Sequence, residues 1–297
     1  MRIALVAVPY QMDMARWGYA LGPQAFLDAG LAAQLVERGH TPGEPVWIEL
    51  PREERTRDSV TNLARIAART AEAVRAALSG GADLALVLEG DCTHAVGAIG
   101  GLAQTDVERG APGVAWIDAH GDLNTMATTT SGYLGGMPYA VALGWDLDDW
   151  RTLAGVEPPV RAEAAALLGA SDLDPAEIEA LARHPILRLD ASDLMGAEAG
   201  ERVARGLAAR AHEAARWYLH LDVDVAGPDT VPGGMTPAPH WPPRARLLEV
   251  ASVAAASVPV RVIGLATYNP AGDPDGRGAR FGIEMTLAMV EGVARRS

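Results

Sequence analysis

The sequence predicts an α/β fold in which helices cover both faces of a parallel sheet of about eight strands. Two observations lead to this prediction. Short apolar runs alternate along the chain with Ala-rich stretches of helical periodicity, which is typical of repeated βα units. No internal repeat or low-complexity linker interrupts the 297 residues, so we expect a single domain over 1–297.

The expected strands are short and spread along the whole chain. They cover residues 3–8, 46–50, 84–88, 114–117, 164–168, 186–189, 218–221 and 260–266. Helices are expected between them, for example over 61–79, where apolar residues recur on one helical face. Near the N-terminus, Pro23 suits the first turn of a helix and Gly30 its end. Ligands of such sheets bind beyond the carboxyl ends of the strands.

Charge and composition limit the kinds of partner. A formal net charge of −13 argues against binding to nucleic acid or to an anionic membrane. The single cysteine excludes an intrachain disulfide and suits a reducing compartment. No apolar stretch approaches the roughly 20 residues of a membrane span, and the first residues lead into a strand rather than a signal peptide. We therefore expect a soluble, cytoplasmic protein that acts on a small molecule.

Two clusters of potential metal ligands follow apolar strands. Asp118, His120 and Asp122 come directly after the strand at 114–117, and Asp222 and Asp224 after the strand at 218–221. Alternate residues at a strand end point the same way. Either cluster alone could be ordinary turn chemistry. Four carboxylates buried together would be costly without counter-charge, so the two clusters favour a pair of divalent cations.

Cys92 follows the strand at 84–88 at an expected helix start, where the helix dipole and a nearby cation lower the pKa of a thiol. A lone cysteine is more often inert core material, so Cys92 either faces the metals or packs in the core. On a helix, His94 would point about 160° away from Cys92. We expect His94 to cap or support the site rather than to bind metal.

These residues resemble the motifs of the ureohydrolase superfamily, which comprises arginases, agmatinases and formimidoylglutamases. Asp118-Ala119-His120-Gly121-Asp122 resembles the family's Asp-Ala-His-x-Asp signature, and Asp222-Val223-Asp224 its Asp-x-Asp signature. The similarity extends over essentially the whole chain. Further matching segments are Asn124-Thr125, 128–132, 232–236 and Asn269-Pro270. In addition, Asp172-Leu173-Asp174-Pro175 with Glu177 resembles the arginase segment that contacts a substrate amino group.

The resemblance implies a three-layer α/β/α fold with two Mn²⁺ ions per chain bridged by hydroxide. Asp118 and Asp222 would contact both ions, Asp122 would complete one site together with Cys92, and His120 and Asp224 would complete the other. Asp122 and His120 are the expected catalytic residues, with Asp122 passing a proton to the departing amine. The chain would assemble as a homo-oligomer, a trimer or hexamer. The expected substrate-binding residues are Asn124, Ser131, Tyr133, Asp174, Glu177 and Thr267.

Three positions depart from the family pattern. Cys92 stands where a metal-binding histidine is expected, and a soft thiolate suits manganese poorly. Gly135 replaces a histidine that shuttles protons in arginase, and Thr267 replaces a glutamate that pairs with guanidinium. The cysteine and the run at 131–137 resemble the branch of the family that includes hydroxyarginine hydrolases.

Three functions remain open from the sequence. The first is hydrolysis of a guanidino or modified guanidino compound, such as a hydroxyguanidine, to release urea or a urea derivative. The second is the same metal chemistry on a neutral linear amide or formimidoyl substrate, which the loss of charge at Thr267 would favour. The third is a catalytically idle binding protein, against which the retained carboxylate and imidazole donors argue.

Overall fold

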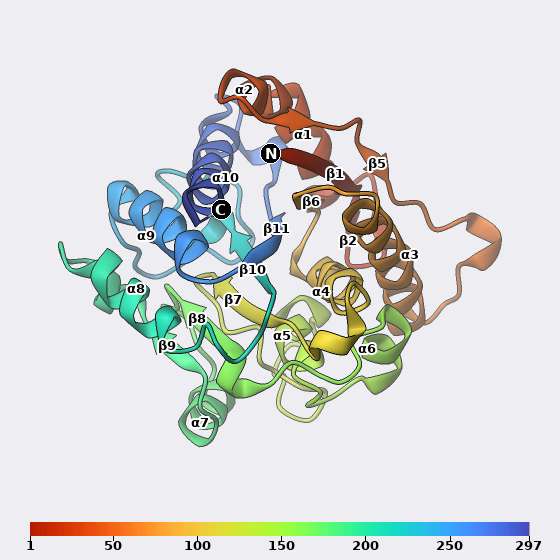
Figure 1. Cartoon of the computed structure of the whole chain (residues 1–297). Helices are drawn as coiled ribbons and strands as arrows, with labels where there is room; N and C mark the ends of the chain where they lie inside the picture. The colour runs from red at the N-terminus through yellow and green to blue at the C-terminus, as the bar shows by residue number, and fades with distance from the viewer. Residues whose placement is uncertain (297) are drawn as a thin grey trace.

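The computed structural model describes residues 1–296, which contain a nine-stranded sheet whose strands all run parallel. The strands follow the order β4-β1-β6-β11-β10-β7-β8-β9, with β5 also paired to β1. Helices cover both faces, as predicted (Figure 1). The strands are β1 (Arg2–Val8), β4 (Thr41–Pro42), β5 (Val46–Trp47), β6 (Leu84–Glu89), β7 (Gly113–Ile117), β8 (Ala165–Leu168), β9 (Leu187–Leu189), β10 (Trp217–Asp222) and β11 (Val260–Ala266). A separate antiparallel pair joins β2 (Tyr10–Gln11) to β3 (Met14–Ala15).

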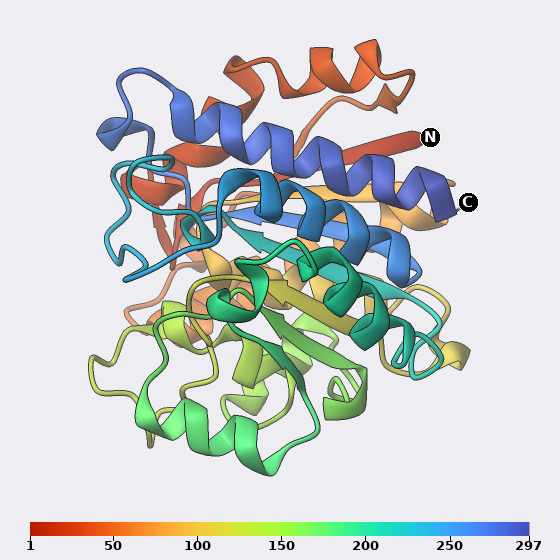
Figure 2. The ribbon, with the colours of Figure 1, turned by 90° about the vertical axis from the view of Figure 1, so that its left-hand side faces the viewer.

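Two helical layers bury the two faces of the sheet in separate apolar cores. Figure 2 shows α9 and α10 lying side by side over one face. That layer contains α1 (Gly22–Asp28), α2 (Leu31–Glu37), α8 (Ala199–Ala208), α9 (Arg244–Ser257) and α10 (Arg277–Arg296). The opposite layer contains α3 (Ser59–Ser79), α4 (Ala95–Ala103), α5 (Pro138–Ala142) and α6 (Asp148–Ala154), and α7 (Pro175–Arg183) adds Leu181 to the same core. None of the described helices is both long and apolar enough to cross a bilayer.

Element boundaries differ from the prediction where local hydrogen bonds decide them. The helix expected over 61–79 begins earlier, at Ser59, because the Asp58 side chain accepts the Thr61 N–H at 2.8 Å and caps it. The strand expected at 46–50 is paired only over Val46–Trp47, after which the Leu50 N–H bonds to a tyrosine hydroxyl. The short strand at Thr41–Pro42 was not predicted, since it has no apolar run. Gly30, with φ +90°, ends α1 and opens α2.

The four central strands end at one edge of the sheet. Leu221 of β10 lies beside Ile117 of β7, Asp222 lies beside Ala266 of β11, and Leu265 of β11 lies beside Leu88 of β6. The residues that follow these strands therefore meet at the carboxyl edge, where ligands of such sheets bind.

Close approach of α3 and α4 depends on glycines in α4. A Cβ added at Gly97 would lie 2.7 Å from the Ala67 carbonyl oxygen and 2.7 Å from Thr70 Cβ. We predict that Gly97→Ala lowers the free energy of unfolding by about 1–3 kcal/mol, because the helices must separate. Denaturant unfolding measures this. The control is Gly196→Ala, where no atom lies within 4 Å of the new Cβ. Equal stability of the two variants would contradict the packing argument.

Candidate metal centre

The two strand ends turn in the same way. The Asp118 side chain accepts the backbone N–H of His120 at 2.7 Å, and the Asp222 side chain accepts that of Asp224 at 2.8 Å. These local turns bring the second residue of each pair beside the first. His120 Nδ1 consequently lies 3.3 Å from Asp224 Oδ2 and 3.4 Å from Asp118 Oδ1. Asp118, His120 and Asp224 thus form one group whose ligand atoms lie within 4.8 Å of one another.

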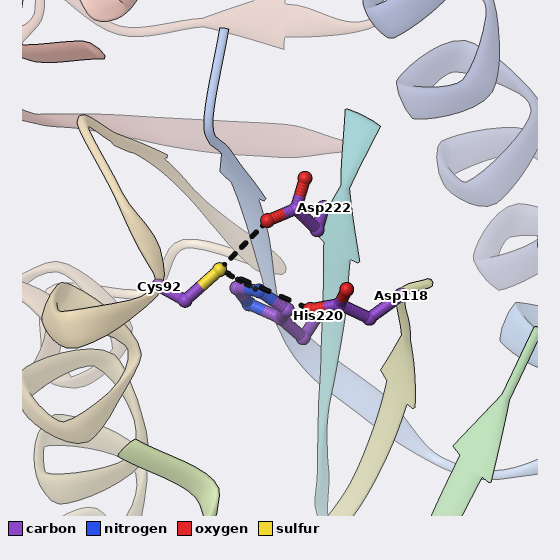
Figure 3. Close-up of side chains that lie close together, drawn as sticks. All are labelled: Cys92, Asp118, His220 and Asp222. Carbon is purple, nitrogen blue, oxygen red and sulfur yellow. Dashed lines mark hydrogen bonds between the residues drawn. The ribbon is translucent and has the colours of Figure 1, made fainter. Parts of the chain in front are cut away.

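A second group of ligand atoms contains Cys92, Asp118, His220 and Asp222, again within 4.8 Å (Figure 3). The Cys92 thiol donates to Asp222 Oδ2 at 2.9 Å, and Sγ lies 4.0 Å from Asp118 Oδ2. Cys92 therefore faces the carboxylates and is not simply part of the core. Asp118 belongs to both groups, so the two candidate sites are adjacent and share a carboxylate.

Buried atoms without partners show that these groups fit divalent cations. His120 Nε2, Asp122 Oδ2 and Asp224 Oδ1 are buried and have no hydrogen-bond partner among the described residues. Unpaired buried carboxylate oxygens are costly, and a bound cation would satisfy them. Carboxylates and imidazoles are also ligands that divalent transition metals accept.

Asp122 lies in the same cavity, although neither ligand group among the described residues includes it. Its backbone has φ +51°, and its carbonyl oxygen accepts the N–H groups of Tyr139 and Ala140, both at 3.1 Å. These bonds hold the residue in a conformation that is uncommon outside glycine. The predicted role of Asp122 as a metal ligand and catalytic residue stays a prediction.

Burial, and then the charges of the group, raise the pKa values of its acids. Burial, then repulsion from Asp222, Asp122 and Asp118, raises the pKa of the Cys92 thiol well above its usual value. The pKa-lowering effect expected of a helix start does not prevail in the chain without metal, because Cys92 lies in a 3₁₀ turn ahead of α4 and is buried beside carboxylates. Burial followed by nearby carboxylates also raises the pKa of Asp222 and of Asp122. Bound cations would act in the opposite direction.

Two departures from the family pattern touch each other. Thr267 follows β11, and its hydroxyl lies 3.3 Å from Cys92 Sγ and also bonds to Asp222. Its φ of +66° is rare for a β-branched residue and costs about 1–3 kcal/mol. The Thr267 N–H bonds to the Gly90 carbonyl oxygen at 3.0 Å, which ties this residue to the segment before Cys92.

A cavity of about 350 Å³ opens above the two groups. Seven of the described residues that line it are Asp or Glu. The described lining contains no lysine or arginine. The lining includes all six predicted substrate-binding residues: Asn124, Ser131, Tyr133, Asp174, Glu177 and Thr267.

Asp174 and Glu177 stabilise the cavity wall through local hydrogen bonds. They form a capping box at the start of α7, in which the Glu177 carboxylate accepts the Asp174 N–H at 2.9 Å. The other Glu177 oxygen accepts the Leu123 N–H at 2.9 Å, and Asn124 donates to Asp174 Oδ2 at 2.9 Å. Glu177 therefore fixes the wall, and Asp174 and Asn124 are bonded to each other beside it.

The third departure, Gly135, is explained by Tyr133. A Cβ at position 135 would lie 2.1 Å from Tyr133 Cε1, so the phenol ring occupies the space that a side chain at Gly135 would need. The Tyr133 hydroxyl lies 3.5 Å from Asp91 Oδ2, at the cavity wall.

The sequence analysis missed the residues beneath the carboxylates. Tyr218, His220 and Asp222 share one face of β10, because side chains of a strand alternate. Trp116 of β7 stacks on His220 with ring centroids 3.8 Å apart, and its indole N–H donates to Asp118 Oδ2 at 3.0 Å. The alternate spacing from Asp222 could have identified His220. His94 lies outside both ligand groups and its Nε2 is 2.8 Å from the Tyr10 carbonyl oxygen.

Comparison with known proteins gives consistent results. A sequence model described as the arginase family matches residues 1–291. The arginase of Brevibacillus brevis is 32% identical over 248 residues, which cover 79% of each protein. The crystal structure of arginase from Bacillus subtilis has a TM-score of 0.86 at 24% identity and covers 98% of both chains. The formimidoylglutamase of B. subtilis subsp. subtilis str. 168 has a TM-score of 0.77 at 19% identity and covers 98% of this chain and 87% of its own. At these identities the two structures show the shared three-layer fold alone.

Metal removal should change how stability depends on pH. Burial raises the pKa of Asp122, Asp222 and Asp224 in the folded chain. Their contribution to stability is therefore fully present below about pH 4, and it is lost as the pH rises through their folded pKa values. After chelation with EDTA, we expect the free energy of unfolding to fall as the pH rises above about 4.

Added Mn²⁺ should counter that fall, because metal binds the ionised carboxylates and its effect grows with pH. At 100 times the dissociation constant, the gain is about 2.7 kcal/mol. Denaturant unfolding with and without metal at each pH measures it, and Asp222→Asn should lose most of the gain. If Mn²⁺ does not stabilise the protein, or stabilises it equally at every pH, the proposed clustering of charge is contradicted.

Proposed function

The chain belongs to the arginase family of hydrolases, and from that premise we propose that it uses two divalent metal ions to cleave a C–N bond of a guanidino or modified guanidino compound. The products are an amine and urea or a urea derivative. One observation supports this proposal most directly. Asp118 belongs to two adjacent groups of ligand atoms, and the cavity opens above them.

Each residue has a distinct task in the proposed reaction. Two bound divalent ions, which we propose are Mn²⁺, would lower the pKa of a bound water so that hydroxide would be available at neutral pH. Asp118 would be shared by the two ions, Asp222 would belong to the Cys92 group, and His120 and Asp224 would complete the oxygen-rich group. Asp122 carries a buried oxygen without a partner, and it takes up a proton at that atom and passes it to the departing amine.

The charge of the cavity favours a cationic substrate. Asp91, Asp172 and Asp174 line it in addition to the candidate ligands, and the described lining contains no lysine or arginine. A substrate with a free amino group is attracted to this wall, whereas an anionic substrate is repelled. Thr267 offers no charge to the reacting group, which suits a modified guanidine that is less basic than guanidine itself.

A second candidate is hydrolysis of a neutral linear amide or formimidoyl compound. Thr267 favours it, because its hydroxyl is uncharged and already bonded to Cys92 and Asp222. The acidic wall favours the guanidino substrate instead. A catalytically idle binding protein is the candidate function with the least support, because buried carboxylates with unpartnered oxygens are costly unless they hold cations. Assembly as a trimer or hexamer in the cytoplasm also stays a proposal.

A substrate screen tests the proposed reaction. Protein loaded with Mn²⁺ is incubated with arginine, hydroxyarginine, agmatine and guanidino acids, and urea and hydroxyurea are measured directly. We expect release from a guanidino compound that carries an amino group. Asp224→Asn should lower the rate by more than the roughly 10–100-fold typical of residues that only support a ligand. Asp28→Asn, an exposed carboxylate on α1, is the control and should leave the rate unchanged.

Two outcomes would separate the candidates. Hydrolysis of amides with no reaction on any guanidino compound would favour the second candidate. Retention of well under one equivalent of metal by the wild-type protein would contradict both.

Replacement of Cys92 tests whether the sulfur weakens manganese binding. Imidazole suits Mn²⁺ better than a soft thiolate does, so Cys92→His should retain Mn²⁺ about tenfold more strongly. Cys92→Ser, which has nearly the same volume but no sulfur, is the control for size. Equilibrium dialysis with metal analysis measures occupancy. If Cys92→His and the wild type hold Mn²⁺ equally, the sulfur does not weaken the site.

A further inference from the structure

His220 lies at the metal centre, although no sequence motif assigns it a role. The side chain is fully buried in β10, and its Nε2 atom is 3.3 Å from Cys92 Sγ. Figure 3 shows the ring beside Cys92 and Asp118, at the base of the ligand group. Its ligand atom lies within 4.8 Å of those of Cys92, Asp118 and Asp222.

Several neighbours fix the orientation of the His220 ring. Trp116 stacks on one face at 3.8 Å, with the two planes inclined by 21°. His220 Nδ1 lies 2.7 Å from the Tyr218 hydroxyl, which in turn lies 3.0 Å from Glu89 Oε1. Gly264 of β11 makes room for this network, because a Cβ there would lie 2.1 Å from the Tyr218 hydroxyl and 2.8 Å from Glu89 Oε1.

The network leaves the second ring nitrogen free to bind metal. When the Tyr218 O–H donates to Glu89, its oxygen accepts the N–H of His220 Nδ1. The lone pair of Nε2 then points toward Cys92 and the carboxylates. Histidines that bind metals nearly always donate their other ring N–H in this way. The competing arrangement has Nε2 donating a proton to the Cys92 sulfur, which would make His220 a hydrogen-bond donor only.

We propose that His220 supplies the histidine ligand that position 92 lacks, so that Cys92, His220, Asp118 and Asp222 bind one of the two ions. This inference rests on the proposed function, which supplies the ions. Ligand atoms of one ion, each about 2.0–2.3 Å from it, lie roughly 3–4 Å apart. The Cys92 Sγ atom lies 2.9 Å from Asp222 Oδ2, 3.3 Å from His220 Nε2 and 4.0 Å from Asp118 Oδ2, in agreement with that range.

The ligand set determines the metal preference. A thiolate and an imidazole together favour a borderline ion such as Zn²⁺ or Co²⁺ over Mn²⁺. The group of Asp118, His120 and Asp224 is richer in oxygen and accepts Mn²⁺. The chain therefore binds two different metals when both are offered. Asp122 is then not required as a ligand of the Cys92 group and remains available for proton transfer.

Cobalt binding tests the inference independently of activity. The protein is treated with EDTA and titrated with Co²⁺ alone, while bound metal and the sulfur-to-cobalt charge-transfer absorption are measured. We expect the wild type to bind two equivalents and to show the sulfur band. His220→Asn keeps an amide near Tyr218 but removes Nε2, so affinity for one equivalent should fall by at least about 10–100-fold, with loss of the band.

A second buried histidine provides the matched control. His94→Gln can keep the bond to the Tyr10 carbonyl oxygen and should retain two equivalents with the wild-type spectrum. Circular dichroism checks the folding of each variant. If His220→Asn does not fold, His220→Gln is offered equal Co²⁺ and Mn²⁺. The preference for one Co²⁺ should then fall about tenfold relative to the wild type.

The two levels of the proposal fail in different ways. A wild-type protein that binds two Co²⁺ ions, with unchanged affinity and spectrum in the folded His220 variant, overturns the role of His220 and leaves the proposed function standing. A wild-type protein that binds no metal overturns the proposed function, and the inference with it.

Discussion

Parallel pairing of β7 with β10 decides where the rest of the centre lies. The two strands end side by side, so Asp118 and Asp222 leave the sheet next to each other and both are buried. Each then accepts the backbone N–H two residues further on, which brings His120 and Asp224 into the same space. The fold thus holds acidic groups close together before any ligand binds. Cations or protonation must offset the repulsion in such an arrangement, so the register of the sheet also sets the charge demand of the centre.

The departures from the family pattern form one connected set. Cys92 touches Thr267 on one side and His220 on the other, both at 3.3 Å. A histidine is missing at position 92, and an imidazole approaches the same group from β10. A glutamate is missing at position 267, and the threonine there lines the cavity with an uncharged hydroxyl that contacts Cys92. The changes are best understood together, as a centre with a different ligand set and a different demand on its substrate.

Much of this arrangement could be predicted from the sequence, because its causes are local. Apolar runs identify buried strands, and the acidic residues directly after them identify the carboxyl edge. The missed features depend on neighbours distant in the chain. Thr41–Pro42 pairs with β1 without any apolar signal, and His220 reads as one more residue of a buried strand until Cys92 is placed against it. The raised thiol pKa of the metal-free chain was missed for the same reason, since Cys92 is buried among carboxylates that follow other strands.

The Tyr133 ring and Gly135 are coupled by their packing at the cavity wall. The phenol ring stands where any side chain at position 135 would have to go. A mutation that restored histidine at 135 would clash unless Tyr133 had already become smaller or moved. A side chain at position 135 and the present placement of the Tyr133 ring therefore exclude each other, so the shape of this wall depends on both positions together.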